Sequence, residues 1–224
     1  MTVLHLADEG ETADLAAFLA RLLHYDRGAA VRLQAAGTTL AVFGRPPSFE
    51  VLAIRTARLA KPYENGLDVA LDATVSAGEL LETVDESAAT FTVPGAVTGP
   101  PWAGVLPPRG GWRPEPGLPA PDALRAMVAA AVAEFRSRTQ ELTAELRTRA
   151  ELDRIGREIW TRTVGDTPLP VRAVHAAQSL GFLRPAGEEP PALVSAGAWL
   201  RLRTPYGSIA VRRAGLGALD VSVR

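Results

Sequence analysis

The sequence predicts an α+β protein: a mostly antiparallel sheet with packed helices, then a proline-rich strap, then helices followed by a β-hairpin. Three observations support this prediction. An early segment has apolar residues at helical spacing, several later segments alternate apolar and polar residues, and a second helical group follows the proline-rich stretch. Hydrophobic residues make up 47% of the 224 residues and charged residues 22%, which is typical of globular proteins.

The clearest helix of the first half is predicted over residues 12–25. Thr12 can cap its start, and Asp14 suits the positive end of the helix dipole. The apolar residues recur at i, i+3, i+4, i+7 and i+8 and so form one stripe: Leu15, Phe18, Leu19, Leu22 and Leu23.

Alternating segments predict the strands of the first half. A hairpin turn is expected at Ala36–Gly37, between the first two strands. Ser76 and Glu79 form an S-x-x-E capping box, which predicts a short helix after the fourth strand. The predicted strands are residues 30–35, 39–43, 49–59, 67–75 and 90–93.

A strap is predicted over residues 94–121, which contain nine of the eighteen prolines. Proline lacks a backbone donor, so neither a helix nor a central strand is expected there. The segment also carries Trp102 and Trp112, and burying each indole would contribute about 2 kcal/mol. We expect an ordered strap with both indoles buried where the two halves meet; the alternative is a proline-rich ligand for an aromatic groove.

The second half is predicted to begin with helices and to end with strands. The first helix starts near Asp122, and its apolar face extends toward Leu142 and Leu146. A hairpin over residues 198–213 turns at Thr204–Gly207 and has alternating apolar positions. Two further helices, over 151–162 and 170–181, and a last short strand over 219–223 are also predicted. The expected division is 1–93, 94–121 and 122–224.

The composition indicates a protein of the bacterial cytoplasm. The chain has no cysteine, which excludes disulfides and thiolate metal sites and fits a reducing compartment. The N-terminal residues do not resemble a signal peptide, and no apolar stretch is long enough for a bilayer, so no membrane association is expected. Lys61 is the only lysine among 24 basic residues, a bias that we attribute to a GC-rich bacterial genome.

No residue pattern indicates catalysis, a metal or a cofactor. The three histidines, His5, His24 and His175, are isolated and lack metal-ligand spacing. The sequence contains no Walker loop and no G-x-S-x-G elbow, and the glycines at 215 and 217 are not followed by a helix. We therefore predict no catalytic, metal-binding or cofactor-binding residue, and an enzyme is the less favoured class.

The order of helix, turn, helix and β-hairpin after residue 150 resembles the winged-helix architecture, although no diagnostic motif accompanies it. Residues 101–224 carry 17 basic and 12 acidic residues, whereas residues 1–100 carry 7 and 13. Arginines at alternate strand positions share a face and can contact phosphates. The candidate nucleic-acid-binding residues are Arg172, His175, Arg201, Arg203, Arg212 and Arg213. The alternative is that these arginines only keep one face of the sheet solvated. Many other arginines of the second half are paired with acidic residues at helical spacing, which favours this alternative.

Three functional hypotheses remain from the sequence. The first is a non-enzymatic interaction or regulatory protein, with a protein partner or self-association. The second is a DNA-associated regulator that uses the winged-helix-like region. The third is an enzyme whose site is assembled from residues dispersed along the chain.

Overall fold

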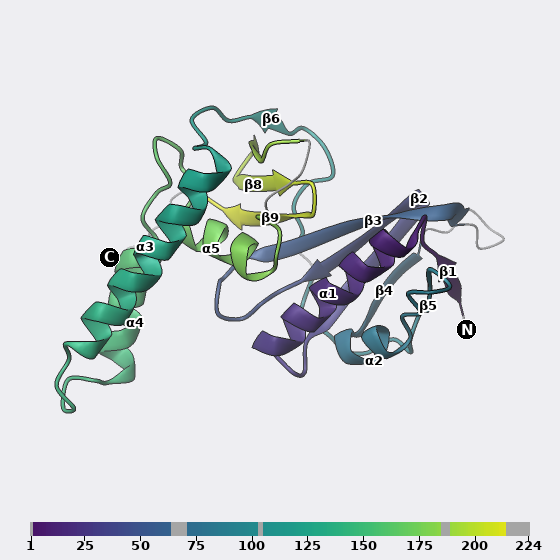
Figure 1. Ribbon diagram of the computed structural model, residues 1–224. Helices are drawn as coiled ribbons and strands as arrows, with labels where there is room; N and C mark the ends of the chain where they lie inside the picture. The colour runs from purple at the N-terminus through teal and green to yellow at the C-terminus, as the bar shows by residue number, and fades with distance from the viewer. Residues whose placement is uncertain (1, 64–70, 103–104, 185–188, 214–224) are drawn as a thin grey trace, which may run out of the picture.

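One antiparallel sheet of seven strands runs through both halves of the chain, in the order β4-β2-β3-β9-β8-β7-β6 (Figure 1). A separate pair, β1 and β5, forms a small second sheet. The computed structural model describes residues 2–63, 71–102, 105–184 and 189–213. The predicted α+β class, with a hairpin near the end, is confirmed.

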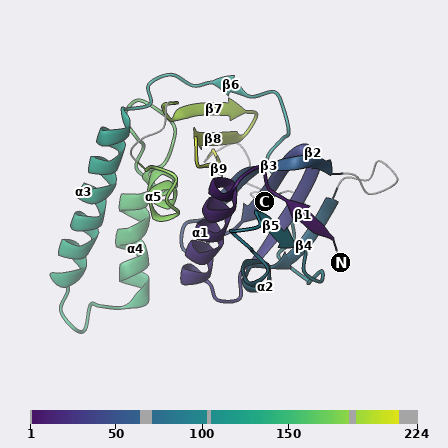
Figure 2. The ribbon, with the colours of Figure 1, turned by 45° about the vertical axis from the view of Figure 1, so that its right-hand side comes forward.

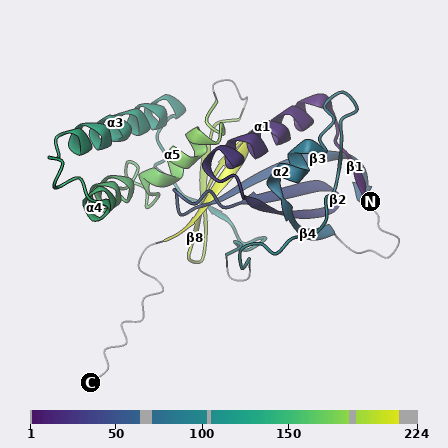
Figure 3. The same ribbon diagram turned by 90° about the horizontal axis from the view of Figure 1, so that it is seen from below.

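In chain order, the helices and strands are β1 (Val3–His5), α1 (Glu9–Tyr25), β2 (Ala30–Gly44), β3 (Leu52–Tyr63), β4 (Leu71–Ser76), α2 (Ala77–Glu82), β5 (Thr90–Thr92), β6 (Arg113–Pro114), α3 (Pro121–Gln140), α4 (Arg149–Trp160), α5 (Val171–Ser179), β7 (Ala192–Ala196), β8 (Trp199–Thr204) and β9 (Gly207–Arg212). The helices lie on one side of the large sheet (Figure 3). The main core lies between the helices and the sheet.

Helix α1 confirms the predicted apolar stripe but begins earlier than predicted. Asp8 is its N-cap, and the Asp8 carboxylate accepts a hydrogen bond from the Glu11 amide at 2.8 Å. The predicted cap, Thr12, is inside the helix, where its hydroxyl donates to the Asp8 carbonyl. The stripe faces the sheet and is buried at Leu15, Phe18, Leu19 and Leu22. The capping box at Ser76 is confirmed, since its hydroxyl accepts from the Glu79 amide.

Strand β2 corrects the prediction of two strands joined by a hairpin at Ala36–Gly37. It is one strand of 15 residues, with a register irregularity between Gly37 and Thr39. Gly37 has a φ of 55°, which a glycine adopts without strain, so the chain bends there without reversing. The strand therefore pairs with β4 through residues 30–35 and with β3 mainly through residues 39–44.

The two halves are joined by pairing between β3 and β9. Leu52, Ala53 and Ile54 pair antiparallel with Ala210, Ile209 and Ser208, respectively. The large sheet therefore passes without a break from residues of the first half to residues of the second. The division into 1–93, 94–121 and 122–224 stays a prediction, but it does not coincide with a division of the sheet.

The strap contributes to the sheet face opposite the helices. Trp102 is only 6% exposed and packs in a small cluster with Phe43, Leu52, Ile54 and Ala210, so it contacts both halves as predicted. Trp112 is only partly buried, lies outside this cluster, and donates its indole N–H to the Pro108 carbonyl. Strand β6 is the part of the strap that joins the large sheet, as an edge strand paired with β7.

Helices α3 and α4 form an antiparallel pair that extends away from the sheet (Figure 2). Helix α3 ends at Gln140, so the predicted continuation of its face was wrong: Leu146 lies in the connection and is 58% exposed. Charged pairs join the two helices, including Arg138 with Glu158 and Arg162 with Glu134. These pairs give Arg138 and Arg162, two of the basic residues of the second half, carboxylate partners from the same half.

Strand β7 was not predicted, and the strand predicted over 219–223 lies outside the described residues. Helix α5 ends as predicted near Gly181, which has a φ of 75°. In the part of the chain that the structure describes, no helix is both long and apolar enough to cross a membrane.

We predict that Trp102→Ala lowers the free energy of unfolding by about 3–5 kcal/mol, because it empties the cluster that joins β3 to β9. Trp112→Ala is the matched control and should cost about 1 kcal/mol or less, since its indole is partly exposed. Urea unfolding followed by circular dichroism measures both. Equal losses for the two variants would contradict the role assigned to Trp102.

Candidate functional site

The sheet face opposite the helices carries most of the predicted arginines. In the β8–β9 hairpin Trp199 pairs with Arg212, Arg201 with Ala210, and Arg203 with Ser208. Arg201, Arg203 and Arg212 therefore share one face, as predicted, while Leu200 and Leu202 are buried against the helices. Two separate concavities hold these arginines.

The first concavity, which we call the junction cavity, has a volume of about 560 Å³ and takes residues from both halves. The loop after β2 contributes Arg45 and Glu50, helix α5 contributes Arg172, and the hairpin contributes Trp199 and Arg212. Its other lining residues are mostly apolar: Pro46, Pro47, Val51, Leu52, Pro100, Val105, Ala210 and Val211. Three arginines and one glutamate thus line a cavity whose other lining residues are mostly apolar.

Of the three cavity arginines, Arg172 is the one with a buried nitrogen that lacks a described hydrogen-bond partner. It is the second residue of α5, whose first residue, Val171, donates its amide to the Arg162 carbonyl. The Nε of Arg172 is buried and has no hydrogen-bond partner among the described residues. A buried donor without an acceptor costs about 1–3 kcal/mol, so this position favours an acceptor supplied from outside the chain.

The second concavity, which we call the arginine pocket, has a volume of about 250 Å³. Arg201, Arg203, Ser208 and Trp112 line it, together with Thr56, Thr204 and Gly207. The Nε and Nη2 of Arg201 donate to the Ser208 hydroxyl oxygen at 3.0 and 2.8 Å. Burial, and secondarily the charge of Arg203, lowers the pKa of the Arg201 guanidinium.

The remaining predicted site residues have other surroundings. His175 lies between two rings, with its ring centre 4.6 Å from that of Trp160 and 5.1 Å from that of Phe49. Arg213 forms an ion pair with Glu115, and the guanidinium of Arg212 lies 5.0 Å from the centre of the Trp199 ring. The six predicted residues therefore do not form one continuous surface.

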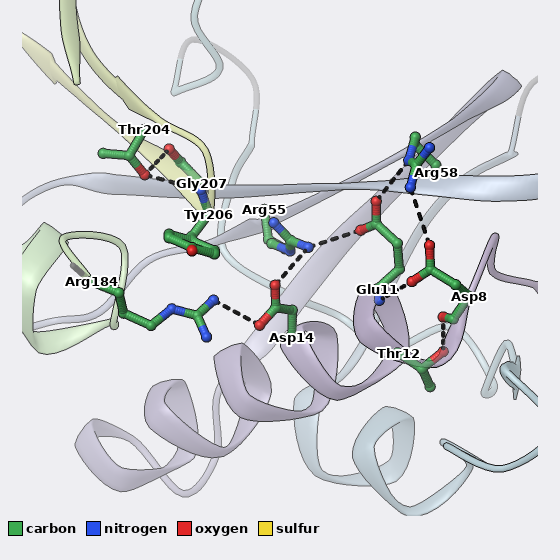
Figure 4. A network of polar contacts seen from close by, with 10 residues as sticks. All are labelled: Asp8, Glu11, Thr12, Asp14, Arg55, Arg58, Arg184, Thr204, Tyr206 and Gly207. Carbon is green, nitrogen blue, oxygen red and sulfur yellow. Dashed lines mark hydrogen bonds and ion pairs between the residues drawn. The ribbon is translucent and has the colours of Figure 1, made fainter. Parts of the chain in front are cut away.

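A third constellation, on the helix side, was not predicted (Figure 4). Arg55 of β3 is 5% exposed and points between Glu11 and Asp14 of α1, at 2.8 and 3.4 Å. Arg184, which follows α5, reaches Asp14 at 2.7 Å and stacks on the Tyr206 ring at 3.8 Å. The available signal was the inward position of Arg55, which alternates with Ala53 and Ala57 on β3.

The carboxylates of this constellation act as counter-ions. A polar cavity of about 460 Å³ lies against them, but Asp8, Glu11 and Asp14 are each engaged by at least one arginine. Carboxylates held in this way stabilise a buried cation and are poorly placed to accept a substrate proton. In the described part of the chain, no group of three or more His, Cys, Asp or Glu residues could hold a metal ion.

Comparison with known proteins divides the chain in the middle of the strap. Residues 1–104 match the family model described as Domain of unknown function (DUF8010), and residues 107–216 match the one described as Domain of unknown function (DUF8185). No curated protein matches the chain. The junction cavity has lining residues from both matched segments, and the β3–β9 pairing joins the two.

We predict that Arg55→Met costs about 3–5 kcal/mol of unfolding free energy, because it leaves the mostly buried carboxylate of Glu11 without its main partner. Arg58 also contacts Glu11 but is 72% exposed, so Arg58→Met should cost no more than about 1 kcal/mol. Chemical denaturation compares the two variants. If Arg58→Met proved as costly as Arg55→Met, the arrangement in Figure 4 would not govern stability.

A further prediction concerns pH. Burial lowers the pKa of His175 below its ordinary value of 6.5, so the unfolded chain takes up this proton at a higher pH than the folded chain. The free energy of unfolding should therefore fall as the pH drops below about 6.5, and His175→Gln should remove part of that dependence. His24→Gln, at an exposed histidine, is the control for the same change of residue type. Unfolding at pH 7.5, 6.5 and 5.5 tests this; identical slopes in both variants would rule it out.

Proposed function

We propose that the protein is a non-enzymatic regulatory protein of the bacterial cytoplasm that binds an anionic small molecule between its two halves. The observation that carries the proposal is the junction cavity with its buried, unpartnered Arg172 Nε. A cavity of about 560 Å³ is within the range of small-molecule sites, and such sites are common where two structural units meet.

The chemistry of the cavity supports an anionic ligand. Arg45, Arg172 and Arg212 outnumber the single carboxylate of Glu50, and a guanidinium can hold a carboxylate or phosphate with two parallel hydrogen bonds. The proline and valine side chains of the lining supply an apolar wall for the rest of the ligand.

The position of the cavity supports a regulatory role. A ligand held there would contact Leu52 of β3 and Ala210 of β9, the residues that pair where the two halves join. A ligand that binds only when β3 and β9 are paired would stabilise the state in which the two halves are joined.

Thermal unfolding against a panel of anionic metabolites, each at ~1 mM, tests this function. At least one should raise the melting temperature by about 2–4 °C or more, as expected for a ligand present well above its Kd. Arg172→Gln should abolish that rise. Arg157→Gln, at an exposed arginine of α4, removes the same charge and should preserve it. A panel without effect, or an equal rise with Arg172→Gln, would contradict the proposal.

The second candidate is a DNA-associated regulator. It is favoured by the exposed arginines Arg203 and Arg212, which share one face of the hairpin that follows the α4–α5 pair. It is weakened by the interior position of His175 and by the ion pair of Arg213. Retention on heparin and a shift of duplex DNA at ~50 mM salt would support this candidate, and their absence would eliminate it.

A further inference from the structure

The arginine pocket is separate from the junction cavity, because the two share no lining residue. It contains two guanidinium groups, from Arg201 and Arg203, and no acidic residue lines it in the described part of the chain. The cross-strand neighbours of these two arginines are not acidic either. The cross-strand neighbours of Arg201 are Val194 and Ala210, and those of Arg203 are Ala192 and Ser208.

Arg201 is a largely buried cation without a counter-ion among the residues that the structure describes. Both of its hydrogen bonds to the protein go to one neutral hydroxyl, that of Ser208, and no described residue forms an ion pair with Arg201 or Arg203. Two like charges at alternate positions of one strand repel each other, and removing one of them from water adds to that cost. The opposite face of the sheet provides a contrast, because Arg55 there has two carboxylate partners.

The other lining groups complete an oxyanion site. Ser208 is 5% exposed and already accepts two hydrogen bonds from Arg201, so its own hydroxyl proton remains to be donated. Thr56, which also lines the pocket, carries a second hydroxyl group that can donate. Donors from two guanidinium groups and two hydroxyls, spread over β3, β8 and β9, match a tetrahedral oxyanion better than a planar carboxylate.

Trp112 indicates that the ligand has an organic part. Its ring lies 5.8 Å from the guanidinium carbon of Arg201 and forms the strap side of the pocket. Its indole N–H is already used by the Pro108 carbonyl, so the ring offers a flat apolar surface. We propose that the arginine pocket binds a phosphate monoester, with the phosphate on Arg201, Arg203 and Ser208 and the organic group against Trp112.

The test is a titration followed by NMR at constant ionic strength, with the indole N–H signal of Trp112 as the reporter. Inorganic phosphate and phenyl phosphate should both shift this signal saturably, and phenyl phosphate should bind more tightly because of the ring contact. Acetate should bind at least about tenfold more weakly than phosphate. Equal binding of acetate would overturn the phosphate assignment, and tighter binding of inorganic phosphate than of phenyl phosphate would overturn the monoester.

Variants connect the signal to the pocket. Arg203→Gln removes an exposed charge and should weaken phenyl phosphate binding by about tenfold or more without affecting the fold. Arg201→Gln should weaken it further. Arg113→Gln, at an exposed arginine of the neighbouring strap strand, is the charge-matched control and should bind as the wild type does. Wild-type affinity in Arg203→Gln, or no saturable shift in the wild type, would overturn the proposal.

Discussion

The pairing of β3 with β9 is the constraint on which the rest of the structure depends. Only three residues of each strand pair, yet they join segments that are more than 150 positions apart in the sequence. This pairing brings the hairpin turn near α1. Tyr206 of the turn stacks with Arg184, and Arg184 forms an ion pair with Asp14 of α1. On the other face it creates the apolar floor on which Trp102 packs, and the junction cavity lies against the same residues.

The arginines near this junction differ in whether they have carboxylate partners. On the helix side, buried Arg55 is matched by carboxylates of α1, so the charges stabilise the fold. In contrast, Arg172 of α5 and Arg201 of the strap-side sheet face are partly buried and lack a described carboxylate partner. Arg55 has two carboxylate partners, whereas Arg172 and Arg201 have none among the described residues, and this difference supports the proposal that the latter two bind an external anion. Both proposed binding sites follow from this contrast.

Local patterns in the sequence were sufficient for the fold class, the apolar stripe of α1, the capping box at Ser76 and the faces of the β8–β9 hairpin. Each of these depends on residues close together in the chain. The errors arose where one local pattern fits two structures. Ala36–Gly37 satisfies a hairpin turn as well as a bulge, and the partner strands of β2 decide between them. The apolar residues beyond Gln140 continue a helical pattern, but the chain turns there to place α4 beside α3.

The candidate site was predictable only in part. Alternation correctly placed Arg201, Arg203 and Arg212 on one face, but it could not reveal that the strap covers Arg201. His175 occupied the expected side of α5, yet Phe49 from the first half and Trp160 enclose it. The junction cavity depends on β3–β9 pairing, which is non-local and has no signature in either strand. Spatial proximity of distant segments was therefore the missing information.

Native-state hydrogen exchange of the amides of residues 52–54 and 208–210 tests the central claim most directly, since these residues form the junction. If the two halves form one cooperative unit, the hydrogen-bonded amides of both strands should open only with global unfolding. Their opening free energies should equal those of buried amides in α1 and α5 and should fall together as urea is added. Exchange at the junction through a lower-energy opening, with the cores of both halves still protected, would contradict this account.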